Sequence, residues 1–542
     1  MRRIIGMVLS VCTVVVVSAF YSCTLCYRKE LKPGKIQVPY SRTIIWKNKS
    51  VFYDSVTAVW ADKTIKYGKE GSKVNNPRIL LARFHRQKQL KETNQLLMGM
   101  KPWGVSGSSW ALNKRGDYDF TCTVLTTILW QFGDKQDMLY PGTLDYLLHV
   151  LLVEDGNKFR TTAPGTLGLY PETENHILMT EGSRYLKNRW LAMHGNNDSY
   201  YNNVQNGMEA KLMEVLQEMK TKGLYEFNSM PYVGYTITAL LNLEAYASDQ
   251  IRKEARAVLD YMNFCYAVGS YHYQHFPPMR RRYERAQWHE LTTDYHSVFF
   301  KAWMSFLPDS KTDFRIGRAM AHALMGACMP YRPADRAASL VLNKNNGYFI
   351  TLGHGKMASP EIYSAGNNYL LSAGGVNRGK KSQIIARPIT LFVDDDATKL
   401  KDVFHLSGPG TDFMEWNNTG VYRHFACAAG PVSVPEGLHP IEEKENWSIY
   451  ELGTDLYVVV YSTRNIGLMT VFEDSNAAQI LKAVVDKNPD KDRLNTHFQF
   501  PQGVGVEYDV NAPKDKWVIK SIDHKEVDRN YDNWPLINGS FN

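Results

Sequence analysis

The sequence predicts a two-part protein in which an all-α part is followed by an antiparallel β part. Apolar residues recur with a helical period over about 250 residues. Beyond Ala337 they give way to short β-branched and aromatic runs separated by Gly, Asn, Asp and Pro. With 542 residues, 44% of them hydrophobic, the chain can bury a large core in more than one domain. We place the helical domain at residues 30–335 and the β domain at residues 340–542.

Residues 1–22 have the composition of an export signal. Arg2 and Arg3 precede an apolar run from Ile4 to Tyr21, the order found in secretory signals. Ser22-Cys23 resembles the end of a bacterial lipobox, in which the cysteine is lipidated. We therefore expect a lipoprotein exported to the periplasm or outer membrane of a bacterium and held at the membrane by its lipid. A retained membrane anchor is the alternative, because about 18 apolar residues can just span a bilayer.

The helical part is predicted as a succession of helices joined by short turns. One begins at Pro77 and runs to Met98, and Thr143 is the expected N-cap of another that runs to Val153. Further helices are expected at residues 174–193, 207–222, 251–262, 291–307 and 316–329. No fixed sequence repeat is visible, which argues against a solenoid. We expect the helices to close into a toroid of paired antiparallel helices.

The β part is predicted from short runs bounded by turn residues. These runs are Tyr348–Leu352, Pro388–Val393, Val421–Phe425, Leu456–Tyr461, Leu468–Phe472 and Lys516–Ile519. Residues 477–485 predict a helix within this part.

Charge and cysteine content narrow the classes of function. The formal charge of +8 permits an anionic ligand, and no Lys/Arg tract of the kind that binds nucleic acid is visible. Cys122, Cys265, Cys328 and Cys427 are far apart and lack CxxC spacing, so we expect small buried hydrophobes and no thiolate zinc site. No cofactor is expected. A divalent metal held in the β part, for example by the Asp394–Asp396 run, is an alternative without support.

Two polar runs stand at the start of apolar helical patterns. Asn175 and His176 come just before an apolar stretch, and a second run holds Glu226, Tyr232 and Tyr235. Since residues at helix entrances gather at one end of a helical array, we expect these runs to face each other and to handle a carbohydrate. The alternatives are that Asn175 caps its helix and that Tyr232 packs in the core.

A loop between two predicted helices carries Trp103 and Trp110. Indole rings stack on the flat C–H faces of sugars, so the loop suits a sugar platform. Anchoring of the loop to the core is the alternative.

This architecture, with an Asn-His pair in the helical part and a Tyr one hairpin later, resembles polysaccharide lyases of the (α/α)-toroid plus antiparallel β-sandwich type, such as alginate, heparin and chondroitin lyases. The resemblance implies a multidomain α-then-β fold, with an incomplete toroid followed by a β-sandwich. It also implies cleavage of a uronic-acid-containing polysaccharide by β-elimination. In these families an Asn or His neutralises the substrate carboxylate and a Tyr acts as acid and sometimes as base. Asn175, His176 and Tyr232 match these roles, and Tyr235 competes for the last.

The resemblance also suggests substrate-binding residues. The families supply an Arg near the Tyr, for which Arg281 and Arg285 are candidates, and a His from the β domain, for which His354 is the candidate. The full set expected to bind substrate is Trp103, Trp110, Glu174, Glu226, Asn228, Tyr235, Arg281, Arg285 and His354.

Two other functions remain open from the sequence. A glycoside hydrolase on the same scaffold needs two carboxyl groups beside the bond, and Asp119, Glu172, Glu174 and Glu226 are available. A non-catalytic glycan-binding surface lipoprotein needs the tryptophan loop but no converging acid and base.

Overall fold

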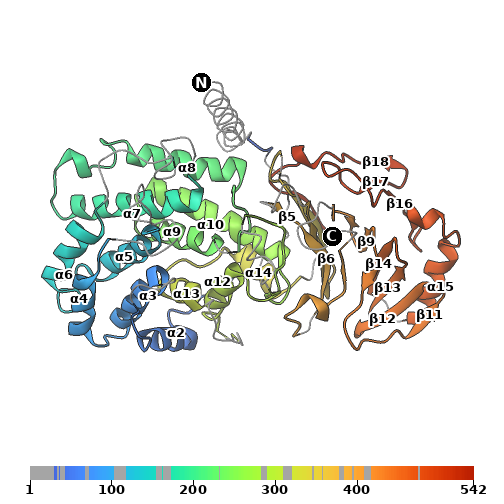
Figure 1. Cartoon of the computed structure of the whole chain (residues 1–542), viewed down its shortest axis with the longest axis horizontal. Helices are drawn as coiled ribbons and strands as arrows, with labels where there is room; N and C mark the ends of the chain where they lie inside the picture. The colour runs from blue at the N-terminus through green and yellow to red at the C-terminus, as the bar shows by residue number, and fades with distance from the viewer. Residues whose placement is uncertain are drawn as a thin grey trace, which may run out of the picture.

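A computed structural model describes most of the chain, and its two halves differ in secondary structure (Figure 1). The described residues are 30–32, 36, 43–66, 72–102, 117–153, 162, 172–230, 232–281, 290–308, 310, 320–344, 347–356, 358–376, 384–393, 396–407, 417–473 and 476–542. Helices fill the N-terminal half and antiparallel sheets the C-terminal half, which confirms the predicted order. The predicted signal segment 1–22 lies outside the described residues.

The helical half is built from helices that contact one another in a closed order. They are α2 (Val51–Ala61), α3 (Ser72–His85), α4 (Leu90–Gly99), α5 (Asp119–Phe132), α6 (Pro141–Tyr146) with a π-helical turn (Leu147–Leu151), α7 (Glu174–Met193), α8 (Met208–Lys222), α9 (Val233–Tyr246), α10 (Asp249–Gly269), α12 (Tyr295–Met304), α13 (Met320–Cys328) and α14 (Asp335–Leu342). Contacts run from α3 to α5, α7, α9, α12 and α13, and α13 contacts α3 again. We call these helices the helix cycle. The helices α2, α8 and α10 pack against its members.

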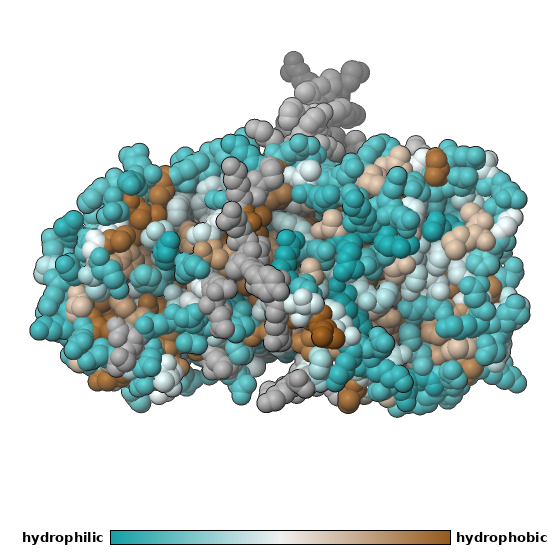
Figure 2. All heavy atoms as spheres, turned by 180° about the vertical axis from the view of Figure 1, so that it is seen from behind, coloured by the Kyte–Doolittle hydropathy of each residue, from teal (hydrophilic) through white to brown (hydrophobic). Residues whose placement is uncertain are grey.

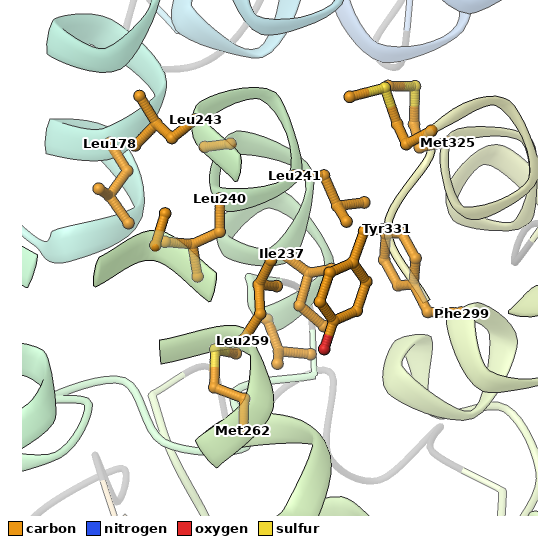
Figure 3. Packing of buried hydrophobic residues seen from close by; sticks show 14 of the residues in the cluster. Leu178, Ile237, Leu240, Leu241, Leu243, Leu259, Met262, Phe299, Met325 and Tyr331 are labelled. Carbon is orange, nitrogen blue, oxygen red and sulfur yellow. The ribbon is translucent and has the colours of Figure 1, made fainter. Parts of the chain in front are cut away.

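The helix cycle is held together by a continuous apolar core (Figure 3). Leu178 of α7 lies close to Leu240 and Leu243 of α9, and Leu259 and Met262 approach from α10. Burial of each such side chain contributes about 1.5–3 kcal/mol. This packing fixes the helix entrances relative to one another.

The prediction of one helix from Pro77 to Met98 is wrong, because the structure has two helices here and the first starts before Pro77. Helix α3 begins at Ser72, so Pro77 lies inside it. Proline has no N–H, and the carbonyl of Lys73 one turn earlier therefore loses its helical donor. That carbonyl accepts a hydrogen bond from Thr121 Oγ1 of α5 at 2.9 Å instead. The chain then breaks at Gln87 and Gln89, both in the left-handed region at φ 49°, before α4 starts.

The predicted cap at Thr143 is also wrong. Helix α6 starts at Pro141, and Thr143 lies in its first turn. Proline is favoured at this position because the first N–H of a helix has no partner within the helix.

The β half contains a seven-stranded, a six-stranded and a four-stranded sheet, all antiparallel. In spatial order the first holds β10 (Val432–Ser433), β7 (His405–Leu406), β6 (Arg387–Val393), β4 (Tyr369–Gly374), β3 (Glu361–Ala365), β2 (Tyr348–Leu352) and β19 (Asn538–Phe541). The second holds β11 (Glu442–Lys444), β12 (Trp447–Gly453), β13 (Leu456–Ser462), β14 (Gly467–Glu473), β9 (Phe425–Ala428) and β8 (Val421–Tyr422). The third holds β15 (His497–Gln499), β16 (Gly505–Tyr508), β17 (Ile519–Ile522) and β18 (Lys525–Glu526).

The seven-stranded sheet lies between the helices and the six-stranded sheet (Figure 1). Neighbouring residues of a strand point to opposite faces, and here both faces are covered. In β4, Leu370 joins the core shared with the helices, whereas Leu371 joins the core shared with the six-stranded sheet. A short pair of strands, β1 (Met279–Arg280) and β5 (Ile384–Ile385), also links the two halves.

Several predicted strands are confirmed and others are wrong. The runs at β2, β6, β13 and β14 are strands, and the predicted helix is α15 (Ala477–Lys487). The run Val421–Phe425 is a hairpin of β8 and β9, which turns at Arg423 with φ 49°. Of the run Lys516–Ile519, only Ile519 belongs to a strand. The four cysteines expected to be small buried hydrophobes are all free thiols; Cys122 and Cys427 are buried, and Cys265 and Cys328 are partly buried.

The surface seen from behind is mostly hydrophilic, with scattered hydrophobic areas (Figure 2). Among the exposed large apolar side chains, Val51 lies in α2, Met193 ends α7 and Val204 lies in the turn before α8. Apolar residues scattered in this way are ordinary on a protein surface.

Candidate active site

The entrances of three helices in the cycle bring the main predicted residues together. Phe120, near the start of α5, contacts His176 of α7 and Tyr235 of α9, with ring centroids 5.8 and 4.5 Å apart. The rings of His176 and Tyr232 are 6.4 Å apart. The imidazole and the phenol, 56 positions apart in the chain, therefore lie at one place.

Asn175 lies inside the first turn of α7 and does not cap it. The N-cap residue is Thr173, whose hydroxyl donates a hydrogen bond to Asn175 Oδ1. Asn175 is 1% exposed, and its Nδ2 has no hydrogen-bond partner among the described residues. Leaving a buried donor unsatisfied costs about 1–3 kcal/mol. Such a group is a candidate for binding a ligand.

His176 is held by a carboxylate from the neighbouring helix. Its Nδ1 lies 2.5 Å from Oδ2 of Asp119, the first residue of α5. Burial by itself would lower the pKa of His176, but the charge and hydrogen bond of Asp119, together with Glu172 and Glu226, raise it to about 9. His176 is therefore an imidazolium at neutral pH. Its side chain is 19% exposed, so solvent reaches it.

Tyr232 lies beside a second cation. The guanidinium carbon of Arg281 is 4.8 Å from the centre of the Tyr232 ring. Arg281 Nη1 also donates to Glu226 Oε1. Arg281 adopts φ 73°, a left-handed conformation that is uncommon for a side chain of this size. Sparsely populated backbone conformations cluster at functional sites.

Two carboxyl groups, on the buried Glu226 and the partly buried Glu172, interact with these cations. Burial raises the pKa of Glu226 to about 7, with Arg281 opposing the rise and Glu174 adding to it. Its Oε2 has no hydrogen-bond partner among the described residues. Burial also raises the pKa of Glu172, with His176 opposing it. Glu174 Oε1 accepts the backbone N–H of Glu226 at 2.7 Å and so ties the 226 segment to the start of α7.

Asn228 and His354 form a separate group where the helical and β halves meet. His354 stacks on Phe227 with centroids 3.8 Å apart and approaches Glu361 Oε1 of β3 at 2.5 Å. Burial opposes the ionisation of Glu361, but hydrogen bonds from His354, Tyr363 and Asn228 hold its pKa below the usual value. Within the described residues, no hydrogen bond or ring contact joins Asn228 or His354 to His176.

Comparisons with known proteins leave the family open. No family model, no curated protein and no solved structure matches this chain. The assignment of function therefore rests on the geometry of the site.

Other predictions concern residues beyond the described part. The residues outside the described part are Trp103, Trp110, Arg285, Asp394 and Asp395.

In the described part, no three or more His, Cys, Asp or Glu side chains are grouped so as to hold a metal ion. None of the described helices is both long and apolar enough to cross a membrane.

The pairing of Asp119 with His176 was not predicted from the sequence. Asp119 was considered only as one of several carboxylates available for hydrolysis. The sequence signal that favours it is its place at a helix start, directly before an apolar helical pattern, which is also the place of Asn175 and His176.

The site thus combines three kinds of group: an amide donor, positive charge and a phenol. Asn175 offers an amide donor, and His176 and Arg281 offer positive charge. Tyr232 offers a phenol beside both cations. Hydrogen-bond donors and cations aimed at one place stabilise an oxyanion that develops there.

Proposed function

We propose that this protein is a polysaccharide lyase that cleaves a uronic-acid-containing polysaccharide by β-elimination. The observation that carries the proposal is the convergence of Tyr232 with His176 and Arg281, at 6.4 and 4.8 Å. The unpartnered buried amide of Asn175 adds a donor at the same helix entrance.

The reaction needs positive charge on the substrate carboxylate. The C5 proton of a uronate is barely acidic beside an ionised carboxylate, so the carboxylate charge must be neutralised before the proton leaves. Asn175, His176 and Arg281 are assigned this role. Elimination then breaks the C4–O bond, forms a C4–C5 double bond and leaves a protonated glycosidic oxygen.

Tyr232 is assigned the proton transfers. His176 is protonated at neutral pH because of Asp119, so it cannot accept the C5 proton. The phenol of Tyr232, which lies beside both cations, is assigned to take the C5 proton and to give a proton to the departing glycosidic oxygen. Tyr235 is the alternative phenol.

The finer architecture belongs to the same proposal. We assign the helix cycle, with its flanking helices, as an incomplete (α/α) toroid over residues 30–335. The seven- and six-stranded sheets, which share one apolar core, support a β-sandwich over residues 340–542. An exported lipoprotein anchored at its N-terminus would meet such a polymeric anionic substrate outside the cytoplasm.

The test is the ultraviolet absorbance of the product. Elimination creates a conjugated unsaturated uronate, whereas hydrolysis and binding do not. The protein is incubated with alginate, glycosaminoglycans and pectic polymers, and absorbance is followed. Absorbance that rises with at least one polymer is the expected result. Absence of any rise on all of them contradicts the proposal.

Two variants test the assigned roles. His176→Ala and Tyr232→Phe should each lower turnover by about two orders of magnitude or more, the scale of a lost acid–base group. Tyr348→Phe, at a buried phenol that binds the Val268 carbonyl, is the control for loss of a hydroxyl elsewhere. If activity falls only in proportion to lost folded protein, the residues have structural roles.

A glycoside hydrolase is the second candidate, and one observation favours it. Burial raises the pKa values of Glu172 and Glu226, and a hydrolase needs such a carboxylic acid to protonate the leaving oxygen. New reducing ends without ultraviolet absorbance would identify this activity.

A further inference from the structure

Arg78 is a buried cation that no carboxylate neutralises within the described part of the chain. It lies in the second turn of α3 and is 1% exposed. Its Nε donates to the Ala321 carbonyl at 3.2 Å and its Nη1 to the Val74 carbonyl at 2.9 Å. These carbonyls carry only partial charge. Buried charges in proteins are normally paired with an opposite charge, so this one calls for an anion from elsewhere.

Three rings from other helices of the cycle interact electrostatically with this cation. The guanidinium carbon is 6.0 Å from the centre of the Tyr235 ring of α9. His322 of α13 contacts Tyr235 and also Tyr295 of α12, with centroids 5.0 and 4.3 Å apart. Tyr235 and Tyr295 are partly exposed at their helix entrances. Helix entrances carry partial positive charge, which adds to that of Arg78.

A second observation at the same place points to a ligand. His322 is 1% exposed, and its Nδ1 has no hydrogen-bond partner among the described residues. Burial and the charge of Arg78 hold the pKa of His322 well below its usual value, so the ring is neutral and adds no cation. Asp294, whose charge acts on His322, is already engaged by His275 Nδ1 at 2.5 Å and by the His296 N–H at 3.2 Å.

We propose that Tyr235, Tyr295 and His322, with Arg78 beneath them, form a second anion subsite that binds the carboxylate or sulfate group of an acidic sugar. The subsite adjoins the candidate active site, because Tyr235 contacts Phe120 and Phe120 contacts His176. This deepens the proposed function, on which it rests: the substrate carries acidic groups on neighbouring sugars, one at His176 and Arg281 and another at Arg78.

The field of Arg78 sets the size of the expected effect. At an effective dielectric constant of about 20, a unit charge about 8 Å away changes the affinity for an anion roughly 30-fold. Loss of one phenol donor changes affinity by about tenfold.

The experiment reads the subsite through His322 itself. Protein with ¹³C-labelled histidine is titrated with glucuronate and with inorganic sulfate to about 50 mM, which detects millimolar affinity. Glucose serves as the neutral control. The His322 signal is assigned with His322→Gln. The two anions distinguish a carboxylate subsite from a sulfate subsite.

The expected result is a saturable shift of the His322 signal with at least one anion and none with glucose. The dissociation constant from that signal should rise at least about tenfold in Tyr295→Phe and more in Arg78→Met. It should stay unchanged in His176→Gln. Should Arg78→Met not fold, Tyr295→Phe decides, because it keeps the ring.

Other results overturn the subsite. These are a His322 signal that neither anion moves, an unchanged dissociation constant in Tyr295→Phe, or a shift that His176→Gln abolishes. The readout needs no turnover. If the His322 signal responds but no polymer is cleaved, the subsite stands and the lyase proposal fails. If a polymer is cleaved by elimination but the His322 signal does not move, the lyase proposal stands and the subsite fails.

Discussion

Replacing Asp119 with Asn tests the state of His176 directly. Asn has the shape of Asp and keeps an oxygen that can accept the Phe120 N–H, as Asp119 Oδ1 does at 3.1 Å. It removes the negative charge that lies 2.5 Å from His176 Nδ1. Only Glu172 and Glu226 then oppose the effect of burial on this imidazole.

The magnitude follows from the raised pKa of His176. A rise from 6.5 to about 9 corresponds to about 3 kcal/mol of preference for the imidazolium in the folded protein. Because the folded pKa is higher than the unfolded one, this contribution is complete below pH 6.5. It declines between pH 6.5 and 9 and is lost above that window. In Asp119→Asn we expect most of it to be absent at every pH.

The assay is the titration of His176 by NMR, with its signal assigned through His176→Gln. The wild type should titrate near pH 9, and Asp119→Asn at or below the ordinary value for histidine. Urea unfolding at pH 6 and pH 9 should show a double-mutant coupling between the two sites at pH 6 that shrinks at pH 9. If the protein is a lyase, its turnover near neutral pH should fall in Asp119→Asn, because His176 is then no longer protonated.

A matched control lies at the other end of the same helix. His194 follows α7 and lies 2.9 Å from Asp134, but the two side chains are 42% and 73% exposed. Solvent screens such a pair, so Asp134→Asn should change stability by less than about 1 kcal/mol. A wild-type His176 that titrates near pH 6.5, or a titration that Asp119→Asn leaves in place, refutes the reasoning.

Three further predictions concern other parts of the molecule. Thr121→Val leaves the Lys73 carbonyl without its donor and should lower the free energy of unfolding by about 1–2 kcal/mol. In a double variant, Pro77→Ala supplies a backbone N–H to that carbonyl and should recover much of the loss. Strictly additive effects of the two substitutions on the free energy of unfolding would contradict this. Burial lowers the pKa of Lys344 to about 7, so the wild type should gain stability relative to Lys344→Met as the pH rises from 7 toward 10. Stability curves of the two proteins that stay parallel over this pH range would contradict the prediction. An anionic ligand favours the protonated form of Glu226, so glucuronate should bind the wild type more tightly below pH 7, as measured by calorimetry. If the same pH dependence of binding persists in Glu226→Gln, Glu226 does not cause it.

Some regular elements were predictable from residue types and periodicity even where they are buried on nearly all sides, as α7 and β2 are. The bounds of α7 and β2 agree with the expected Glu174–Met193 and Tyr348–Leu352. Strand β3 was not predicted, because it begins with Glu361, a residue type that is depleted in strands. That carboxylate is tolerated in the core only through partners such as His354, which no local pattern reveals.

The site was predictable in part, for a similar reason. Asn175, His176 and Tyr232 are marked locally, since each is polar and stands where an apolar helix begins. Asp119 lies 57 residues before its partner His176, and Arg78 is a single cation inside a helical pattern. Their significance comes from contacts between helices that only the closed order of the helix cycle creates.

The acidic groups around the site affect how it would bind an acidic sugar in the proposed reaction. Four carboxyl groups, on Asp119, Glu172, Glu174 and Glu226, would repel a uronate if all were free and charged. Asp119 is matched by His176, and Glu226 is matched by Arg281. Burial raises the pKa values of Glu172 and Glu226, so a nearby anion favours their neutral forms. In the proposed reaction, the acids hold the cations in position in the free protein, and Glu172 and Glu226 can bind a proton when the substrate carboxylate binds. Without Asp119, Glu172 and Glu226, burial would favour the neutral form of His176, and Arg281 would lose its ion pair with Glu226.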